Sequence, residues 1–116
     1  MSFRLLLVFA GLAVAPLAWA GGPSKAQIAA GDQLFHGSGC AHCHGENLQG
    51  SDVGPSLRDV GKRLKPDQIT KQIHDGGMVM PAFGNVLSGD QIDQLVAFLR
   101  TQKAKTPRKN KPSAGL

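Results

Sequence analysis

The chain has few aromatic side chains and no tyrosine. Its 116 residues include five phenylalanines and one tryptophan, and Trp19 lies in an N-terminal segment that we expect to be removed. Residues 21–116 then keep only Phe35, Phe83 and Phe98. A chain of this size buries a marginal core and usually needs a disulfide, a metal or another cross-link. The composition therefore predicts a large apolar group, such as a cofactor, at the centre of the fold.

A long hydrophobic run is also absent. Arg4 precedes an apolar stretch, residues 5–14, that is shorter than the ~20 residues of a membrane-spanning helix. Pro16 interrupts the segment, and Ala18-Trp19-Ala20 matches the A-x-A pattern of a cleavage site. We therefore expect residues 1–20 to be a cleaved signal peptide, and the protein to be exported to a bacterial periplasm.

Acidic residues are missing from the C-terminal end. Residues 21–100 contain seven basic and eight acidic residues, whereas the end of the chain has no acid and carries Lys103, Lys105, Arg108, Lys109 and Lys111. We expect one domain over residues 21–103 and a disordered basic tail over residues 104–116. The tail either increases solubility or docks on an acidic partner or, weakly, on an anionic membrane surface. The near-neutral domain predicts no basic face on the folded part and no nucleic-acid binding.

Three segments have the sequence signals of helices. Each begins with a capping box or with a proline suited to the first helical turn, and each carries apolar residues at helical spacing. The predicted helices follow Ser24, Lys65 and Ser88. The first ends near Gly37 and Gly39, the second at Gly76-Gly77, and the third is closed by Arg100 and Lys103. The segments between them are rich in glycine and show no strand pattern. We therefore predict an all-α domain of three main helices with long loops.

The two cysteines of the chain lie in "GCAHCHG", residues 39–45. Four kinds of site use such a pair: a zinc site, a redox-active dithiol, a structural disulfide or a covalent haem attachment. A zinc site needs four ligands, and no second paired cluster is present. A disulfide between Cys40 and Cys43 would close a loop too short to add much stability. A thiol-disulfide oxidoreductase needs its first cysteine at a helix N-terminus after a buried strand, and here the cysteines follow a helix.

Cys-x-x-Cys-His is the attachment signature of c-type haem. In this interpretation each thiol adds across a haem vinyl group, and His44 binds the iron. His42, between the cysteines, would point away from the ring and remain exposed. The signature suits an exported helical chain that needs an apolar centre, so we favour haem attachment and keep the thiol-disulfide oxidoreductase as the alternative outside this class.

A haem iron bound by histidine also has a sixth position, and a methionine thioether there raises its redox potential. Residues 76–84, "GGMVMPAFG", contain Met78 and Met80. Two glycines before them let the backbone approach a ring closely, and Pro81 stiffens the loop. Both methionines are therefore candidates for the sixth ligand.

At these residues the chain resembles the class I cytochromes c, the mono-haem family with His/Met ligation. The similarity extends from Ser24 to about Lys103. Gly31-x-x-x-Phe35 resembles part of that family's N-terminal helix, and "LVAFLR", residues 95–100, resembles the C-terminal helix that crosses it. The resemblance implies the cytochrome c fold, in which helices and long loops surround one covalently bound haem c and its iron.

The resemblance also assigns individual residues. "GPSL", residues 54–57, is similar to the loop whose proline carbonyl accepts a hydrogen bond from the ligand histidine. "MPAF" matches the axial loop, which favours Met80 over Met78. The implied haem environment is Pro55, Leu57 and Arg63, with Arg63 as a partner of a haem propionate. The tyrosine or tryptophan that family members often place at the propionates has no counterpart in residues 21–116.

An iron bound by both His44 and Met80 has no open position for a substrate. The resemblance therefore implies a monomeric one-electron carrier rather than an enzyme. Its partners would be redox proteins, either a periplasmic dehydrogenase or a membrane respiratory complex. The alternative within the same chemistry is a dedicated cytochrome subunit of a periplasmic dehydrogenase.

Overall fold

The structure is a computed structural model that describes residues 21–103. All of the regular secondary structure within that range is helical, which confirms the predicted all-α class. The helices are α1 (Lys25–Gly37), α2 (Cys40–His44), α3 (Val60–Arg63), α4 (Pro66–Asp75) and α5 (Gly89–Arg100). The expected signal peptide, residues 1–20, and the expected basic tail, residues 104–116, lie outside the described residues.

The three longer helices begin where the capping signals predict. Ser24 Oγ accepts a hydrogen bond from the backbone N–H of Gln27 at 3.2 Å, and Gln27 Oε1 accepts one from the backbone N–H of Ser24 at 2.9 Å. Ser88 and Gln91 repeat this arrangement at the start of α5. Pro66 is the first residue of α4, where its missing N–H leaves no hydrogen bond unmade.

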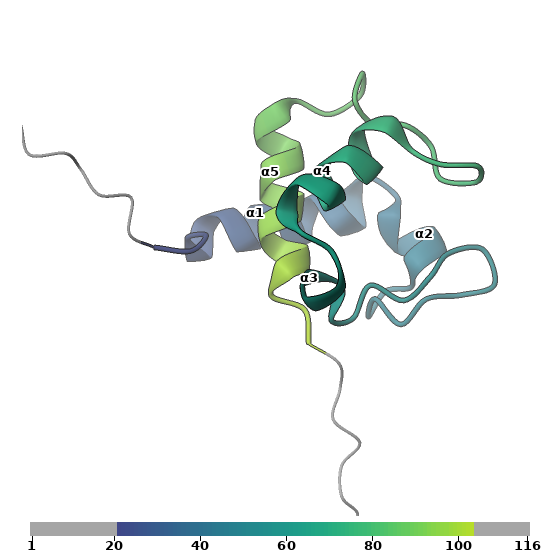
Figure 1. Ribbon diagram of the computed structural model, residues 1–116, viewed down its shortest axis with the longest axis horizontal. Coiled ribbons are helices and arrows are strands. Elements are labelled where there is room, and N and C mark those ends of the chain that lie inside the picture. The colour runs from purple at the N-terminus through teal and green to yellow at the C-terminus, as the bar shows by residue number, and fades with distance from the viewer. Residues whose placement is uncertain (1–20, 104–116) are drawn as a thin grey trace, which may run out of the picture.

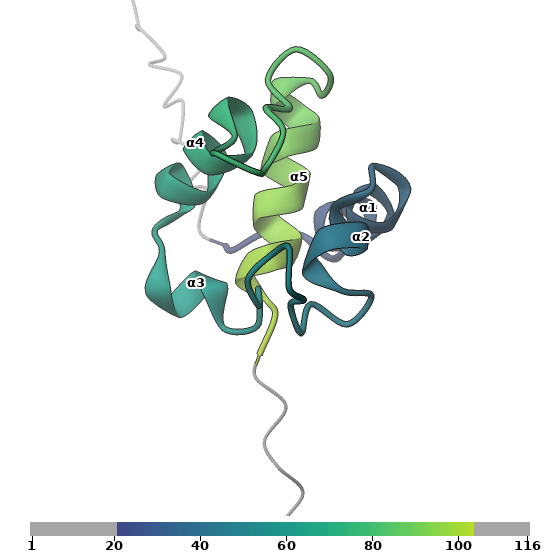
Figure 2. The ribbon, with the colours of Figure 1, turned by 90° about the vertical axis from the view of Figure 1, so that its right-hand side faces the viewer.

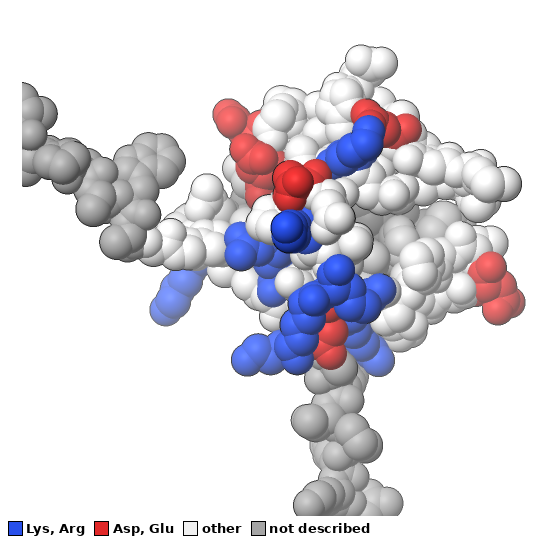
Figure 3. Space-filling model, in the orientation of Figure 1, with Lys and Arg blue, Asp and Glu red and all other residues white. Residues whose placement is uncertain are grey.

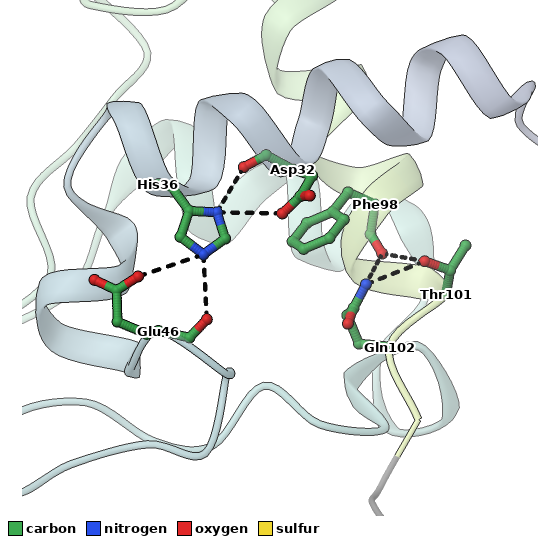
Figure 4. Close-up of polar contacts among 6 residues, drawn as sticks. All are labelled: Asp32, His36, Glu46, Phe98, Thr101 and Gln102. Atoms are coloured by element: carbon green, nitrogen blue, oxygen red, sulfur yellow. Dashed lines mark hydrogen bonds and ion pairs between the residues drawn. The ribbon is translucent and has the colours of Figure 1, made fainter.

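The last helix ends at the first of the two basic residues predicted to close it. α5 stops at Arg100, and Lys103 lies three residues beyond its end. Thr101 Oγ1 and Gln102 Nε2 donate hydrogen bonds to the carbonyl oxygen of Phe98 at 2.7 and 3.1 Å (Figure 4). These side chains satisfy a carbonyl of the last turn, so the chain can leave the helix.

Helices α1 and α5 cross at close range around Gly31 (Figure 1). A Cβ atom at Gly31 would collide with the backbone carbonyl oxygen of Gln94. Just beyond the crossing, the rings of Phe35 and Phe98 lie 5.7 Å apart, between centroids. The predicted crossing of the N- and C-terminal helices is confirmed, and it depends on the absence of a side chain at Gly31.

Helix α5 occupies the centre of the domain. Figure 2 shows α1 and α2 on one side of α5 and α3 and α4 on the other. The buried core gathers apolar side chains from all five helices and from the loop after α2. Its members are Phe35, Ala41, Leu48, Val60, Ile69, Ile73, Ile92, Leu95, Val96, Phe98 and Leu99.

Two short helices were not predicted from the sequence. Helix α2 begins after Gly39, which has a φ of +85°, so the chain turns sharply out of α1 before it coils again. Helix α3 lies against the end of α5: the backbone N–H of Asp59 donates to the carbonyl oxygen of Gln102 at 3.0 Å. A Cβ at Gly61 would lie 2.9 Å from Cα of Arg100. Single turns of this kind depend on tertiary contacts rather than on a periodic pattern.

The charge distribution also differs from the prediction. Lysine and arginine side chains gather on one part of the surface, over α3 and the end of α5 (Figure 3). The expectation of no basic face on the folded part is therefore wrong. A net charge near zero does not reveal that the basic and acidic side chains lie on different parts of the surface. Within residues 21–103, no helix is long and apolar enough to cross a membrane.

Candidate functional site

Helix α2 presents both cysteines and one histidine from a single turn. Cys40 and Cys43 are three residues apart, a spacing that places their side chains on one face of a helix. Both are free thiols and half-buried. Ala41 and His44 are buried, whereas His42 is exposed, as expected of a residue that points away from the site.

His44 is fixed in one orientation by a loop carbonyl. Its side chain is 8 % exposed, and Nδ1 lies 2.8 Å from the backbone oxygen of Pro55. A carbonyl oxygen can only accept, so this contact assigns the proton to Nδ1 and leaves the lone pair on Nε2. A histidine held in this way has the tautomer and the fixed ring that a metal ligand needs.

The loop that carries Pro55 is attached to α2 by short contacts. Ser51 Oγ donates a hydrogen bond to the carbonyl oxygen of Cys43 at 2.6 Å. The backbone N–H of Gly50 donates one to the carbonyl oxygen of His44 at 2.7 Å. A Cβ at Gly54 would lie 2.7 Å from the Cys43 oxygen. The loop therefore packs directly against the backbone of the Cys-x-x-Cys turn, which holds the Pro55 carbonyl opposite His44.

The thiols do not have the electrostatics of a reactive dithiol. The cysteines follow α1, as predicted, but Cys40 also opens the short helix α2, which was not predicted. No strand precedes it among the described residues, however, and burial raises the pKa of the Cys40 thiol. A thiol-disulfide oxidoreductase needs the opposite shift, since the thiolate is its nucleophile. Residues 21–103 also hold no cluster of three or more histidine, cysteine or acidic ligands for a metal ion such as zinc.

The two methionines of the second loop have different surroundings. Met78 is fully exposed, whereas Met80 is half-buried and packs against the core. The backbone N–H of Gly77 donates to the carbonyl oxygen of Met80 at 2.9 Å. Gln72 Nε2 on α4 lies 4.0 Å from Met80 Sδ, at the limit of a hydrogen bond to sulfur. The structure therefore holds Met80, and not Met78, against the domain.

The Met80 loop returns to the end of α4 at two points. The backbone N–H of Phe83 donates to the carbonyl oxygen of Ile73, and the backbone N–H of Gly84 donates to the carbonyl oxygen of His74. Both distances are 3.0 Å. At the start of the loop, Gly76 has a φ of +70°, a conformation that favours glycine. A Cβ there would lie 2.6 Å from the Met80 carbonyl oxygen. Helix α4 thus fixes the loop at both ends.

The two other residues assigned by resemblance lie on the segment between α2 and α4. Leu57 is half-buried and packs against the core. Arg63, the last residue of α3, is exposed, and its Nη2 donates to the carbonyl oxygens of Ser56 and Arg58 at 2.9 and 3.3 Å. These bonds use one nitrogen of the guanidinium, which leaves further N–H donors for an anionic group.

One polar cluster beside the site was not predicted from the sequence. The His36 ring on α1 lies 2.9 Å from the Asp32 carbonyl through Nδ1 and 3.2 Å from the Glu46 carbonyl through Nε2 (Figure 4). The two carboxylates lie 3.2 and 3.5 Å from the same nitrogens. The two carbonyls, and to a smaller extent the two carboxylates, raise the pKa of His36. This cluster connects the end of α1 to Glu46, which lies just after α2.

Comparison with known proteins identifies the family. The family model described as cytochrome c oxidase, cbb3-type, subunit III matches residues 26–99. Cytochrome c6 of Rippkaea orientalis (strain PCC 8801 / RF-1) is 32% identical over 102 residues, which are 84% of this chain and 86% of that protein. The chain belongs to the class I c-type cytochromes. The family's role is electron transport, and its cofactor is covalently bound haem c with iron.

A second relative is a longer protein, of which this cytochrome matches only a part. The menaquinol:cytochrome c reductase cytochrome c subunit of Bacillus subtilis (strain 168) is 44% identical over 79 residues. Those residues are 66% of this chain and 29% of that protein, so the cytochrome spans less than a third of the Bacillus subunit.

Two solved structures show the same fold. The c-type cytochrome XoxG from Methylobacterium extorquens AM1 superimposes with a TM-score of 0.57 and 26% identity, over 71% of this chain and 61% of that one. Cytochrome c6 from the diatom Phaeodactylum tricornutum gives a TM-score of 0.53 and 30% identity, over 63% and 90% of the two chains. The predicted cytochrome c fold is confirmed.

The residues of this cytochrome fit a haem. His44 Nε2 accepts no hydrogen bond within the described part of the chain, and both thiols lie on the same short helix. Partly exposed apolar side chains at the edge of the core come from α2, from the segment after Pro55 and from the loop that carries Met80. They are Cys40, Leu57, Met80, Phe83 and Leu87. A flat apolar ring bound there would complete a core that has few aromatic side chains.

Proposed function

We propose that this cytochrome is a periplasmic one-electron carrier whose haem is bound by Cys40 and Cys43 and ligated by His44 and Met80. The observation that carries the proposal is the inward placement of both axial candidates. His44 is buried and held by Pro55, and Met80 packs against the core while Met78 is exposed. When bound, the haem supplies one-electron chemistry between ferrous and ferric iron.

The roles of the protein's own residues follow from this arrangement. Pro55 holds the proton of His44 on Nδ1 and so keeps Nε2 directed to the site in both oxidation states. Gly76 and the contacts to α4 keep the Met80 loop close to the core. With both ligands fixed, no position is left for a substrate, and little rearrangement accompanies electron transfer. Arg63, with its spare N–H donors, is placed to pair with a propionate.

A visible spectrum combined with a redox titration of protein matured in a periplasm tests the proposal. We expect the spectrum of a low-spin c-type haem, the weak near-infrared sulfur-to-iron(III) band of His/Met ligation, and no binding of carbon monoxide by the reduced protein at neutral pH. Rapid carbon monoxide binding would instead indicate an open iron and an enzyme or a ligand-binding protein. Titratable free thiols in the mature protein would support the thiol-disulfide oxidoreductase.

A second candidate is a dedicated cytochrome subunit or domain of a larger redox enzyme. It is favoured by the relatives in which a cytochrome is part of a longer chain. The chain aligns with 29% of the Bacillus subtilis reductase subunit and with 17% of the dihydro-heme d1 dehydrogenase NirN. Size-exclusion chromatography of the protein purified from its own periplasm separates the two candidates. A free monomer supports the carrier, and a stable co-purifying enzyme supports the subunit.

A further inference from the structure

The cations of the folded domain gather at one end of it. Five basic residues lie on or beside α3 and at the end of α5, and we call them the α3 basic face. They are Arg58, Lys62, Lys65, Arg100 and Lys103. Arg63 lies among them but is not counted, because we assign it to a haem propionate. Figure 3 shows basic side chains gathered around the point where the described domain ends, with an acidic side chain among them.

Tertiary contacts bring these residues together from three parts of the chain. Arg63 Nη2 bonds the Arg58 carbonyl, which places the segment before α3 beside its last turn. The backbones of Gly61 and Arg100 are in direct contact, and α3 is bonded to Gln102 through Asp59. Lys65 follows α3 by two residues. The basic face is therefore a fixed feature of the folded domain and is distinct from the tail.

Acidic residues do not cancel this charge. Asp59, which lies 3.4 Å from Lys62 Nζ, and Asp67 in the first turn of α4 are the acids that border the face. The five cations therefore exceed the bordering acids by three. Asp90 and Asp93 lie in the first half of α5, about 15 and 10 Å from Arg100 along the helix at 1.5 Å per residue. This separation gives the domain an electric dipole that turns α3 toward a negative surface.

The position of the face indicates the kind of partner. α3 and α2, which carries the cysteines, flank α5 in Figure 2, and both lie on the same side of α5 in Figure 1, so the basic face borders the α2 side without covering it. An electron partner must approach the side of α2 and the Met80 loop, so the basic face does not form the centre of that contact. From residue 104 onward the sequence adds Lys105, Arg108, Lys109 and Lys111 without any acid. Leu64, between Arg63 and Lys65 in the sequence, is 37 % exposed. A surface with many cations suits a layer of anionic headgroups.

We propose that the α3 basic face docks this cytochrome on an anionic phospholipid surface, with the α2 side left free for electron exchange. Each lysine or arginine near such a surface strengthens binding about fivefold, and the attraction falls off within a Debye length of about 8 Å at physiological salt. Reversal of two lysine charges on the face should therefore weaken binding roughly 25-fold or more. The proposed function enters only through the assignment of α2 to electron exchange, and the docking itself does not require it.

Co-sedimentation of the full-length holoprotein with vesicles tests this proposal. The vesicles contain phosphatidylcholine with about one third phosphatidylglycerol, and pure phosphatidylcholine is the blank. The test variant is Lys62→Glu with Lys65→Glu. The matched control is Lys25→Glu with Lys71→Glu, two exposed lysines outside the face that change the net charge by the same amount. Both double variants are also made in a chain that ends at Lys103, so that the contributions of the basic face and of the tail to vesicle binding are measured separately.

We expect salt-sensitive binding to the anionic vesicles only, a loss of roughly 25-fold or more in the face variant, and a change of less than about twofold in the control. The difference between the variants should persist in the chain without the tail. Equal losses in both variants, no binding, or binding that depends on the tail alone would overturn the proposal. Slower reduction by an acidic redox protein without vesicle binding would also overturn it and assign the face to that protein. An unchanged visible spectrum in every variant separates these results from a failure of the haem assignment.

Discussion

A Cβ atom added to Gly31 would lie 2.6 Å from the Cβ of Phe98, closer than two side chains can approach. Gly31→Ala therefore has to separate α1 from α5. We expect the variant to lose about 1–3 kcal/mol of stability, the usual effect of overpacking, in thermal or denaturant unfolding of the holoprotein. Gly37→Ala, at the open end of α1, is the control and should be neutral or stabilising by up to about 1 kcal/mol. Equal stability of the two variants would contradict the tight crossing.

Gly76 should control the position of Met80. A Cβ at Gly76 would lie 2.7 Å from the Ala82 nitrogen, and the positive φ adds strain for any other residue. In Gly76→Ala we expect the near-infrared sulfur-to-iron band to weaken and carbon monoxide binding to increase, while the helical circular dichroism stays. Gly77→Ala is the control, since its Cβ meets only the end of the flexible Gln72 side chain at 3.2 Å. A variant at Gly76 with an unchanged band would show that the loop tolerates the displacement.

Met80 and Met78 should differ sharply when each is replaced by alanine. Because Met80 is the inward residue, Met80→Ala should abolish the sulfur-to-iron band, lower the redox potential and allow carbon monoxide to bind the reduced iron. Met78→Ala, at a fully exposed position, should change none of these appreciably. The assignment is wrong if the band survives in the first variant and disappears in the second. Survival in both would mean that the loop exchanges ligands.

The chain should not fold stably without its haem. The core has two fully buried large side chains, Phe35 and Leu95, and its apolar edge residues remain partly exposed around the proposed site. We expect Cys40→Ala with Cys43→Ala to show little stable helix and no cooperative thermal transition by circular dichroism. The unmodified holoprotein, prepared in parallel, is the reference. A cooperative transition in the double variant would refute this prediction.

His36 should stabilise the domain more at acidic than at alkaline pH. The carbonyls of Asp32 and Glu46 raise its pKa in the folded state above the ordinary value of 6.5. Protonated His36 therefore favours folding, its contribution is complete below that value, and it is lost as pH rises through the folded pKa. The difference in Tm between the protein and His36→Ala should be larger at about pH 5 than at about pH 9. An equal difference in Tm at both pH values would contradict this prediction.

The sequence determined the parts of this protein that depend on neighbours in the chain. The capping boxes at Ser24 and Ser88 and the proline at the start of α4 fixed where the long helices begin, because a helix start is satisfied by residues three positions away. The Cys-x-x-Cys-His spacing identified the covalent haem chemistry because all of its residues lie within five consecutive positions. The resemblance carried by "GPSL" and "MPAF" then predicted which loops would approach the site.

Only the tertiary structure decided the features that join distant segments. The placement of His36 between α1 and the residue after α2 depends on how the loops pack, and no sequence pattern indicated it. The resemblance predicted the roles of Pro55 and Met80, but the 2.8 Å contact of Pro55 with His44 and the packing of Met80 against the core are formed only in the fold. The short helix α3 is formed against the end of α5, and it gathers cations that are dispersed along the sequence into one basic face. The net charge of a sequence is a sum, but the electrostatic effect of each charge depends on its position in space. The near-neutral net charge of residues 21–100 therefore could not show that basic and acidic side chains separate on the folded surface.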